Sequence, residues 1–220
     1  MTKIPLYLAL VLLSITTTAS SKAQTGDVEG TITIKAGGST KKDRKGVVVY
    51  LENVPGTPPK AKNATIKQRE KQFDPPFTIV VKGTTVDFPN EDKIFHNVFS
   101  VSRPARFDLG LYKSGTMKSV EMKRPGVVDV YCNIHPDMVA KVKVLDNAFY
   151  TITGPDGAFH IEGVPAGEYP IVAWLPSGGE ATGKVTVKVG VAATLSLEVT
   201  ETATKTTHTR KDGTPYGRYK

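Results

Sequence analysis

The residues best suited to chemistry in this sequence lie in two short segments. One holds Cys132, His135 and Met138, three residues apart, between two stretches with the composition of strands. The other holds His96 and Asn97 within the run FHNVF. A thiolate, two imidazoles and one weak thioether form the ligand set of a mononuclear blue-copper site. The sequence therefore predicts that His96, Cys132, His135 and Met138 bind one type 1 copper ion.

The ligand types also indicate what such a site does. A thiolate is soft and favours Cu(I), whereas imidazole binds both Cu(I) and Cu(II). A trigonal arrangement of two histidines and one cysteine, with a distant methionine, suits neither oxidation state completely. Because the geometry then changes little when an electron arrives or leaves, the reorganisation energy stays low. We therefore expect a one-electron carrier rather than an enzyme.

The composition excludes several other classes of site. The 220 residues include one Cys, which rules out an internal disulfide framework and a zinc site built on several thiolates. Of the four histidines, only His160 and His208 remain beyond the predicted ligands, too few for a multicopper oxidase or nitrite reductase. We expect His160 on a strand surface and His208 in solvent. No Ser-His-Asp or paired-carboxylate arrangement stands out.

Short strand-like runs separated by Gly and Pro turns position these residues. Thr and Val are abundant, helix-period stretches are missing, and the pattern predicts an all-β fold of β-sandwiches. Strands are expected at Phe77–Val81, Thr84–Phe88, Phe95–Val101, Val127–Tyr131 and Val139–Leu145. The cysteine loop then joins two strands at one end of a sandwich, with the His96 segment beside it.

The segment from about Ala64 to Leu145 resembles the plastocyanin/azurin family of cupredoxins, and its short Cys-to-Met loop is similar to that of amicyanin. The resemblance implies a Greek-key β-sandwich and matches the four predicted ligands one by one. It also implies that Asn97 supports the site, its backbone N–H bonding the cysteine sulfur and its side chain tying the two ligand loops together. Phe95 departs from the family, since many relatives carry Pro before the first histidine.

A second resemblance covers Asp156–Tyr169, which looks like the centre of a carboxypeptidase-regulatory-like, transthyretin-like β-sandwich. Residues 146–200 are few for an independent core, and 26–55 has the usual opening strands of such a domain. We therefore predict a split sandwich, 26–55 plus 146–200, with a cupredoxin domain, 56–145, inserted. Its core should join Val47, Val49 and Leu51 to Phe159, Ile161, Tyr169 and Trp174. The alternative is a tandem order, with 26–55 as the first strands of a longer cupredoxin.

The two ends of the sequence have compositions of their own. Residues 1–23 combine Lys3, a twelve-residue apolar run and a small-residue cleavage pattern ending at Ala23, which predicts a cleaved signal peptide. Export to the periplasm, or to the outside of the cell, follows, with no transmembrane segment in the mature chain. Residues 201–220 are polar, Thr-rich and basic, and are expected to form a flexible tail.

Charge suggests the kind of partner. The net charge is +8, or +6 once residues 1–23 are removed, and 56–145 alone carries +6. A basic redox module favours a redox protein partner with an acidic docking surface. No stacking platform for nucleic acid is evident. Two other functions stay open: copper handling or sensing without electron transfer, and a cell-surface binding or scaffold role for the second sandwich.

Overall fold

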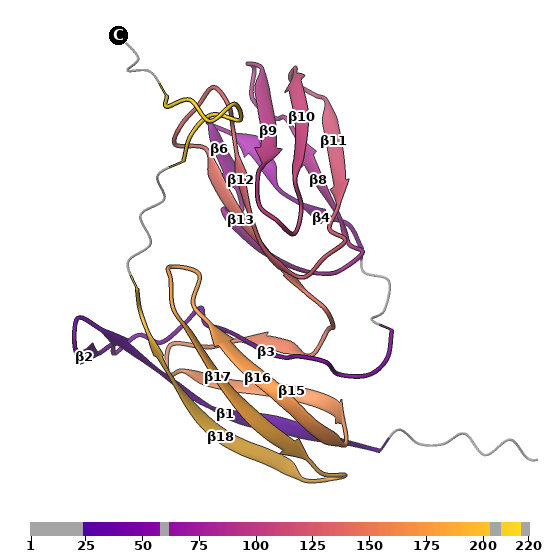
Figure 1. The fold of residues 1–220 in the computed structure, drawn as a ribbon, viewed down its shortest axis with the longest axis vertical. Helices are drawn as coiled ribbons and strands as arrows, with labels where there is room; N and C mark the ends of the chain where they lie inside the picture. The colour runs from indigo at the N-terminus through magenta and orange to yellow at the C-terminus, as the bar shows by residue number, and fades with distance from the viewer. Residues whose placement is uncertain (1–23, 58–61, 203–207, 217–220) are drawn as a thin grey trace, which may run out of the picture.

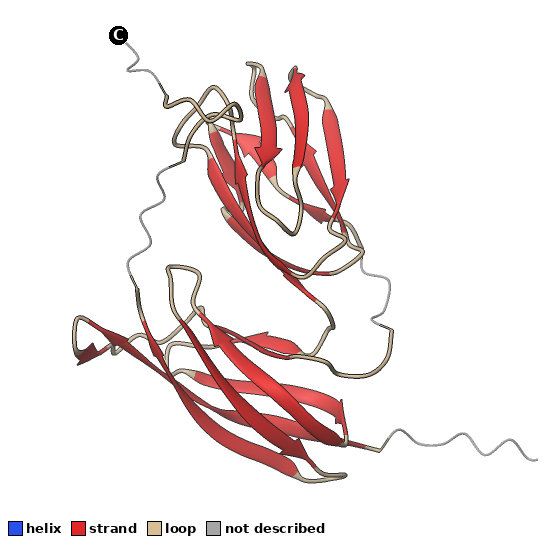
Figure 2. Ribbon diagram, viewed as in Figure 1, coloured by secondary structure: helices blue, strands red, loops and turns tan. Residues whose placement is uncertain are grey.

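The structure is a computed structural model of the chain, and it describes residues 24–57, 62–202 and 208–216. Every regular element within these residues is a β-strand (Figure 2), so the predicted all-β fold is confirmed. None of the described residues forms a helix with the length and apolarity of a membrane span. The signal peptide predicted for residues 1–23 lies outside the described residues.

The strands form two β-sandwiches (Figure 1), and the one we call the flanking sandwich combines an N-terminal and a C-terminal stretch. One of its sheets has the order β15-β1-β18, with β2 paired to β1, and the other has the order β14-β3-β16-β17. Its strands are β1 Thr25–Ala36, β2 Ser39–Thr40, β3 Val48–Leu51, β14 Tyr150–Ile152, β15 Ala158–Pro165, β16 Gly167–Trp174, β17 Glu180–Val187 and β18 Ala192–Thr200.

Both stretches contribute to one core in this sandwich. β1 pairs antiparallel with β15 and parallel with β18, and β3 lies between β14 and β16. A Cβ at Gly30 in β1 would lie 1.8 Å from the carbonyl oxygen of Leu195, so only glycine lets β18 approach this closely. The core joins apolar side chains of both stretches, among them Val28, Ile32, Val47, Val49, Leu51, Phe159, Ile161, Tyr169 and Ile171.

The central sandwich is built from the strands between these two stretches. A five-stranded sheet of order β10-β9-β12-β13-β7 faces a three-stranded sheet of order β11-β8-β4, and β5 and β6 form a hairpin. Its strands are β4 Ala64–Thr65, β5 Lys67–Arg69, β6 Gln72–Asp74, β7 Phe77–Val81, β8 Thr85–Pro89, β9 His96–Ser100, β10 Phe107–Tyr112, β11 Met117–Glu121, β12 Gly126–Tyr131 and β13 Val139–Leu145. All five residues of β9 are buried, so this strand crosses the middle of the domain.

The two sandwiches meet through a third apolar cluster. Val48, Tyr50 and Val172 of the flanking sandwich pack there with Leu145 of β13. Trp174 belongs to this junction rather than to the core in which the sequence analysis expects it, and its ring lies 5.7 Å from that of Phe77. The physical reason is the alternation of side chains along β16: Ala173 faces the core, so the next residue faces the other way.

The described part of the C-terminal segment differs from the prediction. Residues 201–220 are expected to form a flexible tail, yet residues 208–216, here called the C-terminal strap, lie against the central sandwich (Figure 1). The His208 ring, expected in solvent, stacks on Tyr131 with 4.1 Å between ring centroids. The polar composition of this segment did not predict the contact, because the strap docks through one ring and several hydrogen bonds rather than through an apolar run.

Candidate metal centre

Three of the predicted ligands meet at one end of the central sandwich. The Sγ atom of Cys132 lies 4.0 Å from Nδ1 of His96 and 3.7 Å from Nδ1 of His135. Among the described residues these three form a group whose possible ligand atoms all lie within 4.8 Å of one another. His96 and Cys132 are fully buried. A buried thiol between two ring nitrogens is a donor set for a soft or borderline metal ion.

The separations can be tested against the size of a metal ion. First-row metals such as zinc bond thiolate sulfur at about 2.3 Å and imidazole nitrogen at about 2.0 Å. In a trigonal plane these bonds would set sulfur about 3.7 Å from each nitrogen. The observed separations of 4.0 and 3.7 Å therefore fit one ion held between the three donors.

The strands and a short closed loop position the donors. His96 is the first residue of β9, and Cys132 follows β12, which pairs with β9 through Tyr131 and Phe99. The loop is closed by two backbone hydrogen bonds, from Cys132 N–H to the Met138 carbonyl (3.2 Å) and from Met138 N–H to the His135 carbonyl (3.1 Å). Adjacent strands and a closed loop thus bring together residues 36 or more positions apart in the sequence.

Met138, the predicted weak ligand, is fully buried at the end of this loop. It belongs to the same core cluster as Cys132, Phe88 and Val98, and β13 begins at the following residue. A thioether needs no hydrogen bond when buried and adapts to irregular space. The structure therefore places Met138 at the end of the loop that carries Cys132 and His135, in the core cluster that also contains Cys132.

The surroundings of Cys132 favour a thiolate. Burial alone disfavours the charged form, but hydrogen bonds from His96 and from backbone N–H groups, that of Asn97 among them, outweigh it and lower the pKa of the Cys132 thiol. Burial also disfavours an imidazolium at His96, yet hydrogen bonds with Cys132 and Asp92 raise the pKa of that ring. Each group thus stabilises the charged form of the other.

Asp92 contacts His96 on the side away from the sulfur. Its Oδ2 lies 2.7 Å from Nε2 of His96, and the carboxylate accepts hydrogen bonds from the backbone N–H groups of Glu70 (2.6 Å) and Lys71 (2.9 Å). Both of these residues have positive φ, 53° and 57°, in the β5–β6 turn. A carboxylate that accepts from Nε2–H leaves Nδ1 free to bind a metal. Sequence reasoning did not assign a role to Asp92; its position four residues before the histidine was the available signal.

Asn97 connects the two ligand-bearing segments. Its Oδ1 accepts a hydrogen bond from the backbone N–H of Asn133 (3.3 Å), next to Cys132, and its Nδ2 donates to Asp108 (2.7 Å). The Asn97 side chain is 2% exposed, so these contacts are shielded from water. The His96 segment and the cysteine loop are therefore cross-linked directly beside the thiol.

One side of the site reaches the surface. His135 is half-buried and helps line a surface depression with Lys71, Gln72, Pro136 and Asp137. Burial, together with the charges of His96 and Lys71, lowers the pKa of the His135 ring. Phe95, the residue before His96, is 57% exposed. Of the four predicted ligands, His135 is thus the one that reaches the surface.

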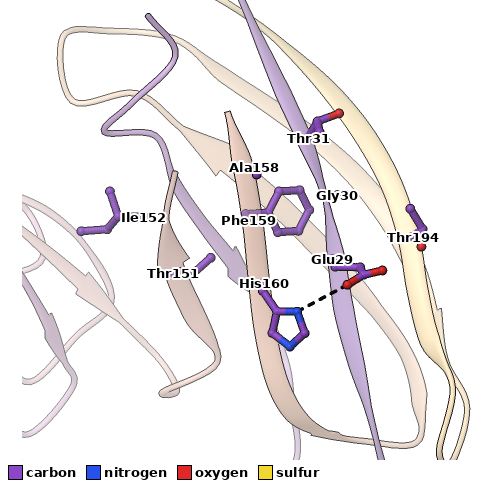
Figure 3. A pocket seen from close by; sticks show the side chains of 9 residues that line it. All are labelled: Glu29, Gly30, Thr31, Thr151, Ile152, Ala158, Phe159, His160 and Thr194. Atoms are coloured by element: carbon purple, nitrogen blue, oxygen red, sulfur yellow. Dashed lines mark ion pairs between the residues drawn. The ribbon is translucent and has the colours of Figure 1, made fainter. Parts of the chain in front are cut away.

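A second depression lies on the flanking sandwich and does not share this chemistry. It opens between β14 and β15 and is bordered by β1 and β18 (Figure 3). His160 is exposed there, as predicted, and its Nδ1 lies 3.5 Å from a carboxylate oxygen of Glu29. Of the residues that the structure describes, only the His96 group brings three potential ligand atoms together.

Comparisons with known proteins give partial matches. No protein-family model and no curated protein matches the sequence. Among solved structures, a purple cupredoxin from Nitrosopumilus maritimus is 24% identical over 37% of this chain and 99% of its own, with a TM-score of 0.34. An amicyanin variant in its reduced state is 26% identical over 37% of this chain and 81% of its own (TM-score 0.35). A copper-containing nitrite reductase from Thermus scotoductus is 25% identical over 39% of this chain and 23% of its own (TM-score 0.37).

Proposed function

We propose that this chain is an exported type 1 copper protein that carries single electrons between redox partners. One observation carries the proposal: a buried thiol with two imidazole Nδ1 atoms at 3.7 and 4.0 Å, close to the separation of about 3.7 Å that one trigonal metal ion would set. Copper, when bound, would supply the Cu(I)/Cu(II) couple. The chain itself holds the donors rigid through the Asp92 and Asn97 contacts and excludes water from His96 and Cys132.

The exposed side of the site supports electron exchange with another protein. His135 is the predicted ligand nearest to solvent, Ile134 and Pro136 adjoin it in the chain, and Phe95, next to His96, adds exposed apolar surface. The central sandwich carries the positive charge of residues 56–145, which would steer a partner with an acidic surface. The periplasm, or the outside of the cell, is the compartment that the predicted signal peptide implies.

The test is a visible and EPR spectrum of the copper-loaded protein. We expect an intense thiolate-to-copper charge-transfer band, reversible oxidation and reduction, and complete loss of the band in Cys132→Ser. Ser119→Ala, a small change elsewhere in the central sandwich, should leave the band in place. A Cys132→Ser protein that stays blue would contradict the assignment of the thiolate.

The same measurements separate the competing functions. Tight, colourless binding of Cu(I) with no stable Cu(II) form would favour copper handling over electron transfer, because a soft thiolate site without redox cycling suits storage. Biological activity that survives Cys132→Ser would instead favour a scaffold role for the flanking sandwich.

A further inference from the structure

The C-terminal strap makes hydrogen bonds to the cysteine loop itself. The Tyr216 hydroxyl donates to the backbone carbonyl of Cys132 at 2.6 Å. The backbone N–H of Lys211 donates to Oδ1 of Asn133 at 3.0 Å. Two positions of the strap thus bind two consecutive residues of the loop, one of them the predicted thiolate ligand.

The strap has a folded form that presents these groups. Its turn is closed by hydrogen bonds from Arg210 N–H to the Thr214 carbonyl and from Gly213 N–H to the Arg210 carbonyl, both 2.9 Å. His208 stacks on Tyr131, the residue before Cys132, with an interplanar angle of 11°. The Tyr216 ring then meets the His208 ring edge to face at 5.1 Å. Ring stacking therefore aligns the strap along the end of β12.

A further contact extends from the strap to the His96 segment. Nζ of Lys211 lies 2.6 Å from a carboxylate oxygen of Asp108, whose other oxygen accepts the hydrogen bond from Asn97. Asn97 in turn accepts from the Asn133 backbone. The strap, the cysteine loop and the His96 segment therefore form one hydrogen-bonded network around the thiol.

We propose that the C-terminal strap is a positioning element of the metal site, with Lys211 and Tyr216 as its positioning residues. The inference rests on the proposed function and adds to it a part of the chain remote in sequence. Hydrogen bonds beyond the ligands fix their orientation and tune the metal. A hydroxyl that donates to the Cys132 carbonyl, and a cation that pairs with Asp108 in the adjoining network, also favour the more electron-rich, reduced state of the site.

The experiment compares Tyr216→Phe and Lys211→Met with the unaltered full-length protein. Tyr216→Phe keeps the ring contacts and removes only the hydroxyl donor. In the copper-free protein, we expect the amides of Cys132 and Met138 to exchange with solvent faster in both variants, by up to about tenfold for one neutral hydrogen bond. In the copper-loaded protein, both variants should shift the reduction potential downward while the blue band persists.

Two control variants make the result specific. Tyr169→Phe removes a hydroxyl 3.5 Å from the carbonyl of Ala166, in the flanking sandwich, and should change neither readout. Lys211→Arg keeps the cation beside Asp108 and should restore the potential. Blue variants with an unchanged potential and unchanged amide exchange would overturn the proposal. Unaltered protein that binds copper without a blue band would overturn the proposed function, and amide exchange in the copper-free variants would then decide by itself whether the strap orders the loop.

Discussion

The central and flanking sandwiches differ in the polar groups that they bury. In the central sandwich the buried polar residues include Gln68, Asn90, His96 and Asn97, and several of them surround the candidate metal centre. In the flanking sandwich the core is apolar, and the buried polar residues in its strands and loops are Asn147 and Thr153. Each buried polar group costs free energy unless it is hydrogen-bonded. His96 and Asn97 are hydrogen-bonded, so this cost is offset, and the same bonds hold their side chains in place.

The two buried polar residues of the flanking sandwich, Asn147 and Thr153, use their hydrogen bonds differently. Nδ2 of Asn147 donates to the Leu51 carbonyl at 2.8 Å, and the Thr153 hydroxyl donates to the Arg44 carbonyl at 2.6 Å. Both bonds join the N-terminal stretch to the C-terminal one. We propose that these two stretches fold as one unit, with the central sandwich inserted between them in the chain. Buried polar groups would then serve assembly in the flanking sandwich and chemistry in the central sandwich.

The largest effect is expected from a substitution that destabilises the core of the flanking sandwich alone. Leu51 is fully buried in β3, so Leu51→Ala should lower the free energy of unfolding of the flanking sandwich by about 2–5 kcal/mol. The blue band of the copper-loaded protein should stay, because the metal centre belongs to the other core. Thermal unfolding followed by circular dichroism and by the visible band measures both. Val191→Ala, at a residue 56% exposed, is the matched control. Equal loss of both signals would mean that one cooperative unit spans the two sandwiches.

The next effect concerns the metal centre alone. Asp92→Asn keeps the shape of the side chain but removes the charge that holds Nε2 of His96, so copper affinity should fall by about 10- to 100-fold. The fold should persist, because the remaining side-chain oxygen can still accept a hydrogen bond from one of the two turn amides, which bond different oxygens of Asp92, Glu70 N–H to Oδ1 and Lys71 N–H to Oδ2. Competition with a copper chelator gives the affinity. Glu91→Gln removes a neighbouring, more exposed charge and should leave affinity within twofold; an equal loss there would point to general electrostatics instead.

The smallest effect lies at the junction between the sandwiches. Nζ of Lys143 lies 3.0 Å from the Tyr50 hydroxyl and over the Tyr50 and Trp174 rings, and burial lowers the pKa of this lysine below its usual 10.5. In the window from the lowered pKa up to 10.5, the unfolded state binds more protons than the folded state. The free energy of unfolding should therefore rise with pH there.

Denaturant titrations of Lys143→Met and the unaltered chain between pH 8 and pH 10.5 measure how the free energy of unfolding of each depends on pH. The variant lacks the titrating group, so the part of the rise due to Lys143 should vanish, while Lys188→Met, on the flanking sandwich, should keep it. Identical pH slopes in Lys143→Met and the unaltered chain would show that the junction does not suppress the charge of Lys143.

The local patterns in the sequence were sufficient for the element type, and they selected three side chains, His96, Cys132 and His135, that the structure brings together. The alternation of apolar residues in β1 and the glycines in the turns predict strands correctly, because these signals come from residues next to one another in the chain. The spacing of Cys132, His135 and Met138 predicts a ligand loop because all three lie within seven residues, on one connection between strands. Trp174 was assigned to the wrong layer because composition does not reveal which face of a strand meets a second domain.

Only the tertiary structure decided how His96 meets that loop and what holds it there. The Asp92 contact depends on a turn at Glu70 and Lys71, and the strap contact depends on Tyr216, 84 residues after Cys132. Such contacts leave no repeating pattern in the sequence, because they form only where the packing of β9 against β12 brings groups that are distant in the chain within hydrogen-bond reach. The sequence by itself thus determined the types of side chain available and placed Cys132, His135 and Met138 on one connection between strands, while chain packing decided the geometry, since a hydrogen bond depends on distance in space and not on separation along the chain.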